Sequence, residues 1–321
     1  MVFIDCWDRA TGYNDETSLN GVASYLFGYK LKGAEILDVS VNVDINESTK
    51  MGQWYKTNSK GNFRLDNAIA RYVPVNGIMF WDMYGKATHT VADQKQTVTN
   101  MTTTEGQKPK KKAFHQWDAS VQKADLFGLV TTRLQLDFAE GNPLVCTQTM
   151  MGCKFDFASS ATPNTPTLPD DSSNNEVTGA FTNFHSWTWN STTMEKPKRF
   201  KMESQQEMIP YMKGTSTYYV DMSPQNPIRT GFVTAVEGTT GYTDLRDDML
   251  AGTERTLTWK QQKVSSTKYF EVTASNTLCH SINALAREPG KPFAYTAVFT
   301  CESLSVEIQD YLDDDWYTIK T

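Results

Sequence analysis

The chain has 321 residues, of which 39% are hydrophobic and 12% aromatic, and its formal net charge is −6. This composition excludes a largely disordered chain, because enough apolar side chains are present to build a core. The mild acidity argues against a dedicated nucleic-acid binder, which normally carries a basic face, but it is compatible with DNA passing without sticking. No apolar run approaches the roughly 18 residues of a membrane-spanning helix, so we expect no membrane partner.

Two further features bear on the compartment in which the protein works. The first residues lack the basic start and the apolar stretch of a secretory signal, so we expect none. The five cysteines are odd in number and irregularly spaced. A disulfide framework is therefore not expected, and reduced thiols in a cytoplasmic assembly compartment fit the pattern better.

Alternation of apolar and polar residues is the dominant signal along the chain, and it predicts β-strands. In the first half, residues 39–45 alternate Val and Ile with Ser, Asn and Asp, and residues 134–138 alternate Leu and Phe with Gln and Asp. In the second half the same pattern occurs at residues 256–259, 270–273 and 304–308. The abundance of Thr, Val, Tyr, Phe and Trp supports strands throughout.

Helical signals are few and short. Residues 76–84 and 243–251 each begin with a plausible N-cap, an Asn and a Thr respectively, and each is followed by a glycine that stops the helix. Helices of two to three turns are not stable alone, so packing rather than propensity must hold them.

A segment rich in Pro and Ser, residues 158–176, divides the chain and is expected to be an extended linker. We therefore predict a first β domain over residues 1–157, which includes an N-terminal segment, and a second over residues 177–321, which ends in an acidic tail. Each half has a strand-like segment, a short helix that ends at glycine, a further strand, a turn rich in Gly and Pro, and a last strand. This shared plan predicts an internal duplication.

Three stretches, taken in order, carry a resemblance to a known family: residues 75–85, residues 128–144 (GLVTTRLQLDFAEGNPL) and residues 245–257 (LRDDMLAGTERTL). They resemble the tail tube proteins of tailed bacteriophages and archaeal tailed viruses. The resemblance implies a mainly β fold with two tandem β-sandwich or half-barrel domains, each with a short flanking α-helix.

The resemblance also implies an assembly. Edge strands of such domains pair around a ring, and the rings stack into a hollow tube through which viral DNA passes without sequence-specific binding. Three chains would form a ring with pseudo-sixfold symmetry if both halves line the lumen, and six chains would be needed if only one half does. The implied location is the tail of the virion, after assembly in the host cytoplasm. The implied partners are further copies of the chain and other tail proteins, namely the tape measure, the tail terminator and the baseplate or tip.

Two polar segments, residues 47–61 and 211–227, are expected to be long loops that bridge stacked rings. Exposed aromatic and Met side chains are enriched in interface cores, although they also cover the core of their own domain. The candidate inter-ring contacts are Met51, Gln53, Trp54, Tyr55, Tyr218, Tyr219 and Met222.

The polar positions of the predicted strands are candidates for the lumen face. Asn42 and Asp44 in the first strand and Glu307 in the last would repel phosphates, although ordinary solvent-facing positions have the same composition. A basic run comprises Lys108, Lys110, Lys111 and Lys112. It is a candidate contact for DNA or for an acidic patch on a neighbouring subunit, but a solvated loop is the favoured interpretation.

No catalytic pattern is present. The four histidines lie far apart, and the sequence has no zinc-ligand spacing, phosphate-binding loop or nucleophile elbow. We therefore expect no enzyme activity, no metal and no cofactor. Trp187 and Trp189 share one face of a strand, where core filling is favoured over a sugar platform. The alternative function is a tail-tip or receptor-binding β-sandwich module that binds carbohydrate.

Overall fold

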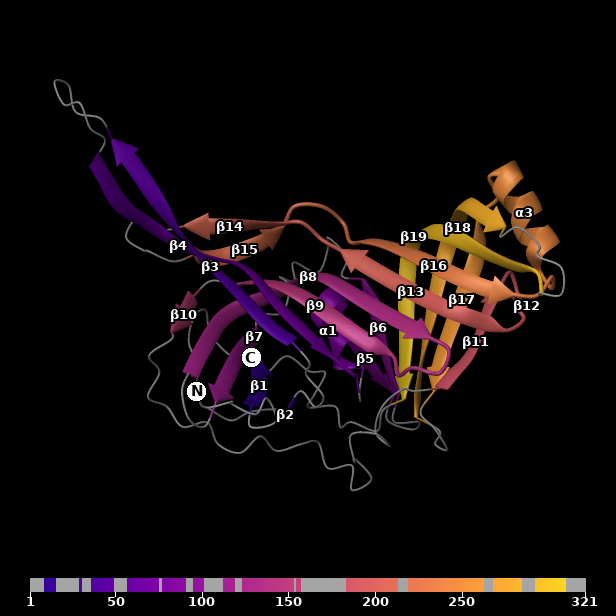
Figure 1. Ribbon diagram of the computed structural model, residues 1–321, viewed down its shortest axis with the longest axis horizontal. Helices are drawn as coiled ribbons and strands as arrows, with labels where there is room; N and C mark the ends of the chain where they lie inside the picture. The colour runs from indigo at the N-terminus through magenta and orange to yellow at the C-terminus, as the bar shows by residue number, and fades with distance from the viewer. Residues whose placement is uncertain are drawn as a thin grey trace.

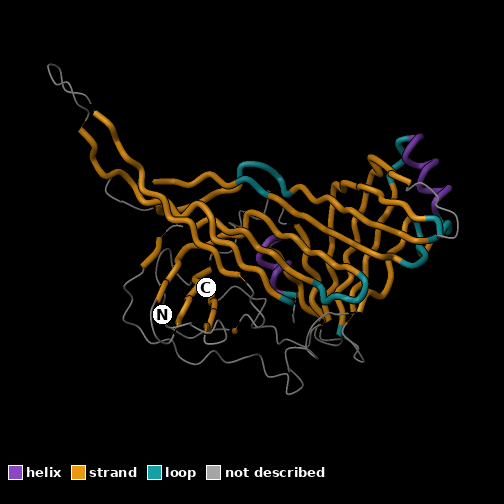
Figure 2. The backbone as a smooth tube through the Cα atoms, in the orientation of Figure 1, coloured by secondary structure: helices purple, strands orange, loops and turns teal. Residues whose placement is uncertain are grey.

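The computed structural model describes residues 9–15, 29–30, 36–48, 57–74, 77–90, 95–100, 112–118, 123–152, 154–156, 183–212, 219–262, 268–284 and 292–309. Within this part the protein is mainly β, with antiparallel strands and two short helices (Figures 1 and 2). The mainly β class predicted from the alternating sequence pattern is therefore confirmed. The predicted linker lies outside the described residues.

The first half contributes β1 (Arg9–Asp15), β2 (Tyr29–Lys30), β3 (Ile36–Ser48), β4 (Thr57–Tyr72), α1 (Ile78–Tyr84), β5 (Gly85–Thr90), β6 (Lys95–Asn100), β7 (Lys112–Asp118), β8 (Lys123–Ala139), β9 (Val145–Gly152) and β10 (Lys154–Asp156). The second half contributes β11 (Asn183–Trp189), β12 (Thr192–Thr193), β13 (Pro197–Gln205), β14 (Met208–Met212), β15 (Tyr219–Pro224), β16 (Arg229–Glu237), α3 (Tyr242–Ala251), β17 (Arg255–Gln262), β18 (Tyr269–Ala284) and β19 (Ala294–Gln309). All five predicted strands fall within these elements.

Both helices end where the sequence predicts and begin elsewhere. Gly85 and Gly252 follow the last helical residues with φ of 79° and 64°, a left-handed conformation that favours glycine. The predicted N-cap of α3 is wrong: the cap is Gly241, and Thr243 lies in the first turn. Tyr242 contacts the rings of Phe293 and Tyr295 at 4.9 and 5.1 Å, so tertiary packing holds the helix start one residue earlier. The predicted N-cap of α1 lies outside the described residues, and the cap observed is Gly77.

The strands of the first half pair in the order β3-β4-β9-β8-β7-β1. The strands of the second half pair in the order β13-β16-β19-β18-β17-β11. The two series meet where β8 pairs with β13. They also meet where β6 pairs with the C-terminal part of β19.

Two layers result, which we call the front and back sheets. The front sheet contains, in order, β3, β4, β9, the C-terminal part of β8, β13, β16, residues 294–301 of β19 and residues 278–284 of β18. The back sheet of the second half contains β11, β17 and the other parts of β18 and β19, extended by β6 and β5. In Figure 1, β13 and β16 cross in front of β11 and β17 at a steep angle, as in orthogonal sheet packing.

Aromatic side chains fill the space between the two sheets. Phe200 of the front sheet stacks on Trp259 of the back sheet with ring centroids 4.4 Å apart, and Phe299 contacts Trp187 at 6.0 Å. Trp187 and Trp189 are completely buried, so they fill the core and do not form a sugar platform. One continuous cluster of buried residues includes members of both halves, so the halves share a hydrophobic core as well as a sheet.

A partly buried ion pair attaches α3 to the back sheet. Asp248 of α3 accepts a hydrogen bond of 2.9 Å from the Trp189 indole, and Arg255 donates to both of its carboxylate oxygens at 2.9–3.1 Å. The Arg255 guanidinium, with help from Trp189, holds the pKa of Asp248 below its ordinary value.

Replacing Asp248 with alanine is expected to destabilise the protein by about 1–3 kcal/mol, because the buried Trp189 N–H loses its acceptor. Asp248→Asn keeps an acceptor and should lose less. Because the folded pKa is depressed, the carboxylate contributes stability above its unfolded pKa of about 4, and this contribution is lost progressively as the pH falls from there through the lower folded pKa. Urea unfolding at pH 7 and pH 3 tests this, and a difference between the wild type and Asp248→Asn that does not shrink at pH 3 contradicts it.

Candidate assembly interface

The joint between the two halves is a regular antiparallel pairing of β8 with β13. The register runs from Ala139 opposite Arg199 to Arg133 opposite Gln205. On the core side, Phe138 lies opposite Phe200 and Leu136 lies opposite Met202, and all four side chains are buried. Strand edges thus join the two halves of the chain without a break in the front sheet.

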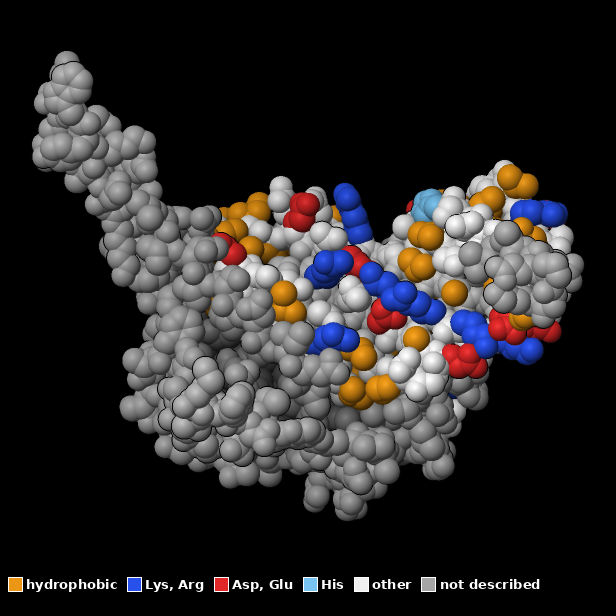
Figure 3. All heavy atoms as spheres, viewed as in Figure 1, with side chains coloured by type: hydrophobic (Ala, Val, Ile, Leu, Met, Phe, Trp, Pro, Cys, Tyr) orange, Lys and Arg blue, Asp and Glu red, His pale blue; other side chains and the backbone are white. Residues whose placement is uncertain are grey.

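The other side of the joint carries charges of both signs. Arg199 pairs with Asp137 at 2.5 Å, Arg133 with Glu203 at 2.7 Å, and Lys198 with Glu140 at 2.6 Å. Partial burial by itself would raise the pKa of Glu203, but hydrogen bonds from Arg133 and Lys201 lower it below its ordinary value. Exposed pairs contribute about 0–1 kcal/mol each, so they favour one register more than they add stability. Figure 3 shows basic and acidic side chains alternating across the middle of this face.

Helix α1 packs against the core side of the joint. The Tyr84 hydroxyl of α1 lies within hydrogen-bond distance of Ser204 in β13 and, at 3.1 Å, of Thr230 in β16. Phe80 meets the ring of Phe270 in β18 at 5.0 Å. Gly77, which precedes the helix, leaves no room for a side chain, because a Cβ there would lie 2.5 Å from Ile308. A helix of the first half is therefore buried against strands of the second.

The hairpin β14–β15 packs beside the joint, on strands β8 and β9 of the first half. Its side chains Met208, Tyr219 and Met222 are buried against Val130 of β8, with Met151 of β9 beside them. Ile209 and Tyr211, on the same hairpin, are 39% and 48% exposed. A hairpin of the second half thus packs on strands of the first.

The predicted inter-ring residues divide into two groups. Tyr219 and Met222 are buried within their own chain, so the exposed side chains of this hairpin are Ile209 and Tyr211 instead. The remaining five lie outside the described residues: Met51, Gln53, Trp54, Tyr55 and Tyr218.

The prediction of two long loops is wrong for part of each segment, and residues 49–56 and 213–218 lie outside the described residues. β3 continues to Ser48 and β4 begins at Thr57, with these two residues paired, and the second segment forms β14–β15. We call the outer part of this hairpin, residues 45–48 paired with residues 57–60, the β3–β4 arm. Most of its residues are polar, so the apolar alternation that marks other strands is missing, and only the cross-strand pairing shows that it is a pair of strands. The arm projects away from the rest of the front sheet in Figure 1.

The structure separates the predicted lumen residues. Asn42 and Asp44 lie in β3, at one border of the front sheet, and nothing further is described of their side chains. Glu307 lies in the part of β19 that belongs to the back sheet, where it contacts Tyr269 and pairs with Lys95 at 3.1 Å. The hydrogen bond from Tyr269 lowers the pKa of Glu307.

The basic run is described at one position only. Lys112 begins β7, and Lys108, Lys110 and Lys111 lie outside the described residues. The choice between a binding role and a solvated loop therefore stays as the sequence left it.

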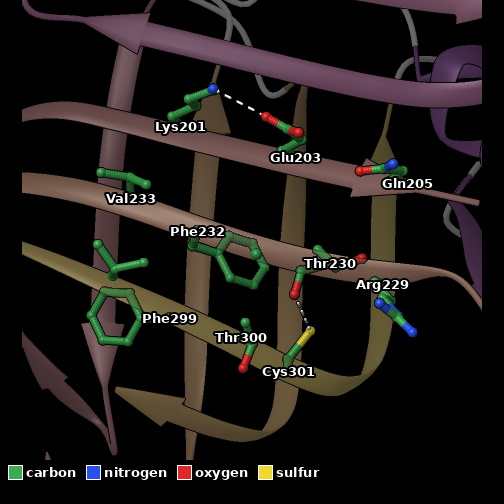
Figure 4. Close-up of a pocket in the computed structure, with 12 residues that line it drawn as sticks. Lys201, Glu203, Gln205, Arg229, Thr230, Phe232, Val233, Phe299, Thr300 and Cys301 are labelled. Carbon is green, nitrogen blue, oxygen red and sulfur yellow. Dashed lines mark hydrogen bonds and ion pairs between the residues drawn. The ribbon is translucent and has the colours of Figure 1, made fainter. Parts of the chain in front are cut away.

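Sequence reasoning missed a hollow on the front sheet, because residues of three strands that are distant in sequence line it. It has a volume of about 550 Å³ and is bordered by β13, β16 and β19 (Figure 4). Lys201, Glu203 and Arg229 line it together with Thr300, and Lys201 pairs with Glu203 at 3.1 Å. Phe232 and Phe299 also border it, but their rings are buried on the core side, so the hollow offers no exposed ring for a sugar to stack on.

The described thiols and the residue types that bind metals are the groups to consider for chemistry. Burial raises the pKa of the Cys146 and Cys301 thiols to about 12 and that of Cys279 to about 11, so all three are protonated near neutral pH. In the part of the chain that the structure describes, no group of three or more His, Cys, Asp or Glu side chains is placed to hold a metal ion. Neither described helix has the length and apolar character needed to cross a membrane.

No protein-family model matches the chain, and no curated protein is significantly similar to it.

Proposed function

We propose that the protein is the structural subunit of a viral tail tube, built from two tandem β units that assemble with further copies into stacked rings. The observation that carries the proposal is the β8–β13 joint, at which one unit adds its border strand to the next. Repeating such a joint between chains extends the front sheet around a ring, and closing the ring removes exposed strand edges.

The match between the two halves supports the tandem arrangement. Both pairing series have the same order, and each half places a short helix, ended by a left-handed glycine, after its second front-sheet strand. The long strands β8 and β18 also share two irregularities. Each has a left-handed residue, Gly128 with φ 65° and Asn276 with φ 48°, and each is bulged four residues later, at Thr132 and His280.

The front sheet would form the wall of the lumen. Because both halves contribute strands to it, both line the lumen, which favours three chains with pseudo-sixfold symmetry over six. The exposed side of the described joint presents paired charges rather than the acidic surface expected from the sequence, and such pairing also leaves few free cations to hold phosphates. Glu307, in the back sheet, would then face the outside of the tube.

A carbohydrate-binding module at a tail tip is the alternative, and the hollow beside Lys201 and Arg229 is the feature that favours it. A module of this kind stays a monomer or trimer and gains thermal stability from its ligand.

Electron microscopy of the purified chain separates the two functions. A tube subunit gives rings with a central hole, or polymers of uniform width, whereas compact particles without a central hole at every concentration contradict the proposal.

Shortening the β3–β4 arm is expected to block stacking without blocking folding. A variant in which a tight turn replaces residues 47–61 removes the projecting end of the arm and leaves the pairing between residues 36–43 and 63–71. We expect unchanged circular dichroism and rings that do not elongate into tubes. Negative-stain microscopy measures this, and tubes of normal length from the shortened chain exclude a role of the arm between rings.

A further inference from the structure

The two halves can be superposed residue by residue through their strand pairings. Thr131 and Cys279 each precede the bulged residue of β8 or β18, so they are equivalent. Their partners are therefore equivalent too, namely Met150 in β9 and Phe299 in β19. Leu136 lies five residues after Thr131, and Ala284 lies five residues after Cys279, so Leu136 of β8 is equivalent to Ala284 of β18.

The equivalence extends to the border strands β3 and β13. Met150 pairs with Ala68 of β4, and Phe299 pairs with Phe232 of β16. On their other sides, Ala68 pairs with Val39 of β3, and Phe232 pairs with Met202 of β13. Val39 in the first half therefore takes the place of Met202 in the second.

The joint inside the chain then specifies a joint between chains. Inside the chain, Leu136 lies opposite Met202. Their equivalents are Ala284 at the end of β18 and Val39 in β3, which occupy opposite borders of the front sheet. Resting on the proposed function, we propose that β3 of one copy pairs antiparallel with residues 281–284 of β18 in the next, with Val39 opposite Ala284 and Ser40 opposite Asn283.

Within the part of the chain that the structure describes, neither border has a second strand partner. Among the described residues, β3 pairs only with β4, and residues 281–284 of β18 pair only with β19. Ser281, Asn283 and Ala284 are exposed, and Ile282 is half-buried. The equivalent stretch of β8 is paired on both sides, with β9 and with β13.

The two other parts of the internal joint have open counterparts as well. Counted back from the terminating glycine, Leu250 of α3 takes the place of Met83 of α1, but Leu250 is 73% exposed and Met83 only 2%. The hairpin β14–β15 packs on Val130, and the equivalent of Val130 is Leu278, which is only half-buried. In the assembly, the next copy covers Leu250, and its β3–β4 arm reaches over Leu278.

The joint between copies differs from the internal joint in charge. Arg133 and Glu203 form an ion pair inside the chain, and their equivalents, Ser281 and Ser40, are neutral. We therefore expect the contact between copies to change little with salt, since screening acts on charged pairs. Hydrogen bonds between the strand edges would supply the specificity of register.

Cysteine cross-linking tests the register directly. Directly opposed residues in antiparallel strands have Cα atoms about 4.5–5.5 Å apart, within the range of a disulfide. In Ser40→Cys/Asn283→Cys, mild oxidation should join separate chains and give a ladder on a non-reducing gel that ends at three chains. Gln135→Cys/Glu203→Cys, at the equivalent positions of the internal joint, is the matched control and should close within one chain, without dimers. Asp38→Cys/Asn283→Cys, shifted by two residues, should react much less, as should the natural cysteines alone.

The outcomes separate this joint from the proposed function. Rings in the microscope without the cross-link, while the internal control closes, overturn the joint and leave the tube function standing. A protein that remains monomeric at high concentration overturns both. An in-register cross-link whose ladder continues beyond three chains supports the joint and excludes a closed ring of three.

Discussion

Replacing Trp259 with alanine is expected to remove most of the stability of the folded chain. Trp259 is completely buried, stacks on Phe200 at 4.4 Å and meets Phe270 edge-on at 5.3 Å. Truncating a buried tryptophan costs about 3–5 kcal/mol, through lost transfer energy and the cavity that remains. Because whole domains are stable by only about 5–15 kcal/mol, the variant should be close to unfolding at physiological temperature.

Urea unfolding followed by circular dichroism measures the loss for Trp259→Ala. Trp259→Phe is the conservative variant and should lose less, because it keeps an aromatic ring and removes an indole N–H that has no hydrogen-bond partner within the described residues. Tyr211→Ala, at a residue that is 48% exposed, is the control and should change the unfolding free energy by about 0.5 kcal/mol or less. A loss below about 1 kcal/mol for Trp259→Ala would show that the core does not depend on contact between the two sheets.

Replacing Leu250 with aspartate is expected to abolish ring formation and leave the folded chain intact. Leu250 is 73% exposed in the single chain, so a charge there costs little on folding. In the proposed assembly the next copy covers this position, as Met83 of α1 is covered inside the chain at 2% exposure. Burying an unpaired carboxylate costs several kcal/mol, so the joint between copies should fail.

Size-exclusion chromatography with light scattering and a thermal melt give the two readouts for this variant. Leu250→Met, which keeps an apolar side chain, should assemble like the wild type. An aspartate variant that melts normally and forms rings at the wild-type concentration would place α3 outside the joint. A variant that melts at a much lower temperature would show that Leu250 packs within its own chain.

Local patterns explain why the strands were predictable. Residues 134–138 and 304–308 alternate between a buried and a solvent-facing side, and the structure shows the same alternation in their burial. Both helix ends were also predictable, because a left-handed C-cap is a property of the glycine itself. The start of α3 was not, because contacts of Tyr242 with residues more than 50 positions away determine it.

The candidate site was less accessible to sequence reasoning. Residues 47–48 and 57–61 were taken for parts of a loop, because they show no apolar alternation and their strand conformation rests on pairing across the hairpin. Tyr219 and Met222 were taken for exposed contacts, but they pack on Val130, which is about 90 residues earlier in the chain. Ion pairs such as Arg199 with Asp137 join strands that are distant in sequence, so no local sequence motif predicts them.

The sequence by itself determined the β class and the ends of the helices, because each depends on neighbouring residues along one element. Only the tertiary structure decided how the halves join, since strand pairing between β8 and β13 depends on the register of backbones that lie some 60 residues apart. The same long-range pairing leaves β3 and the end of β18 with one strand partner each among the described residues, and it is to these two borders that we propose another copy binds.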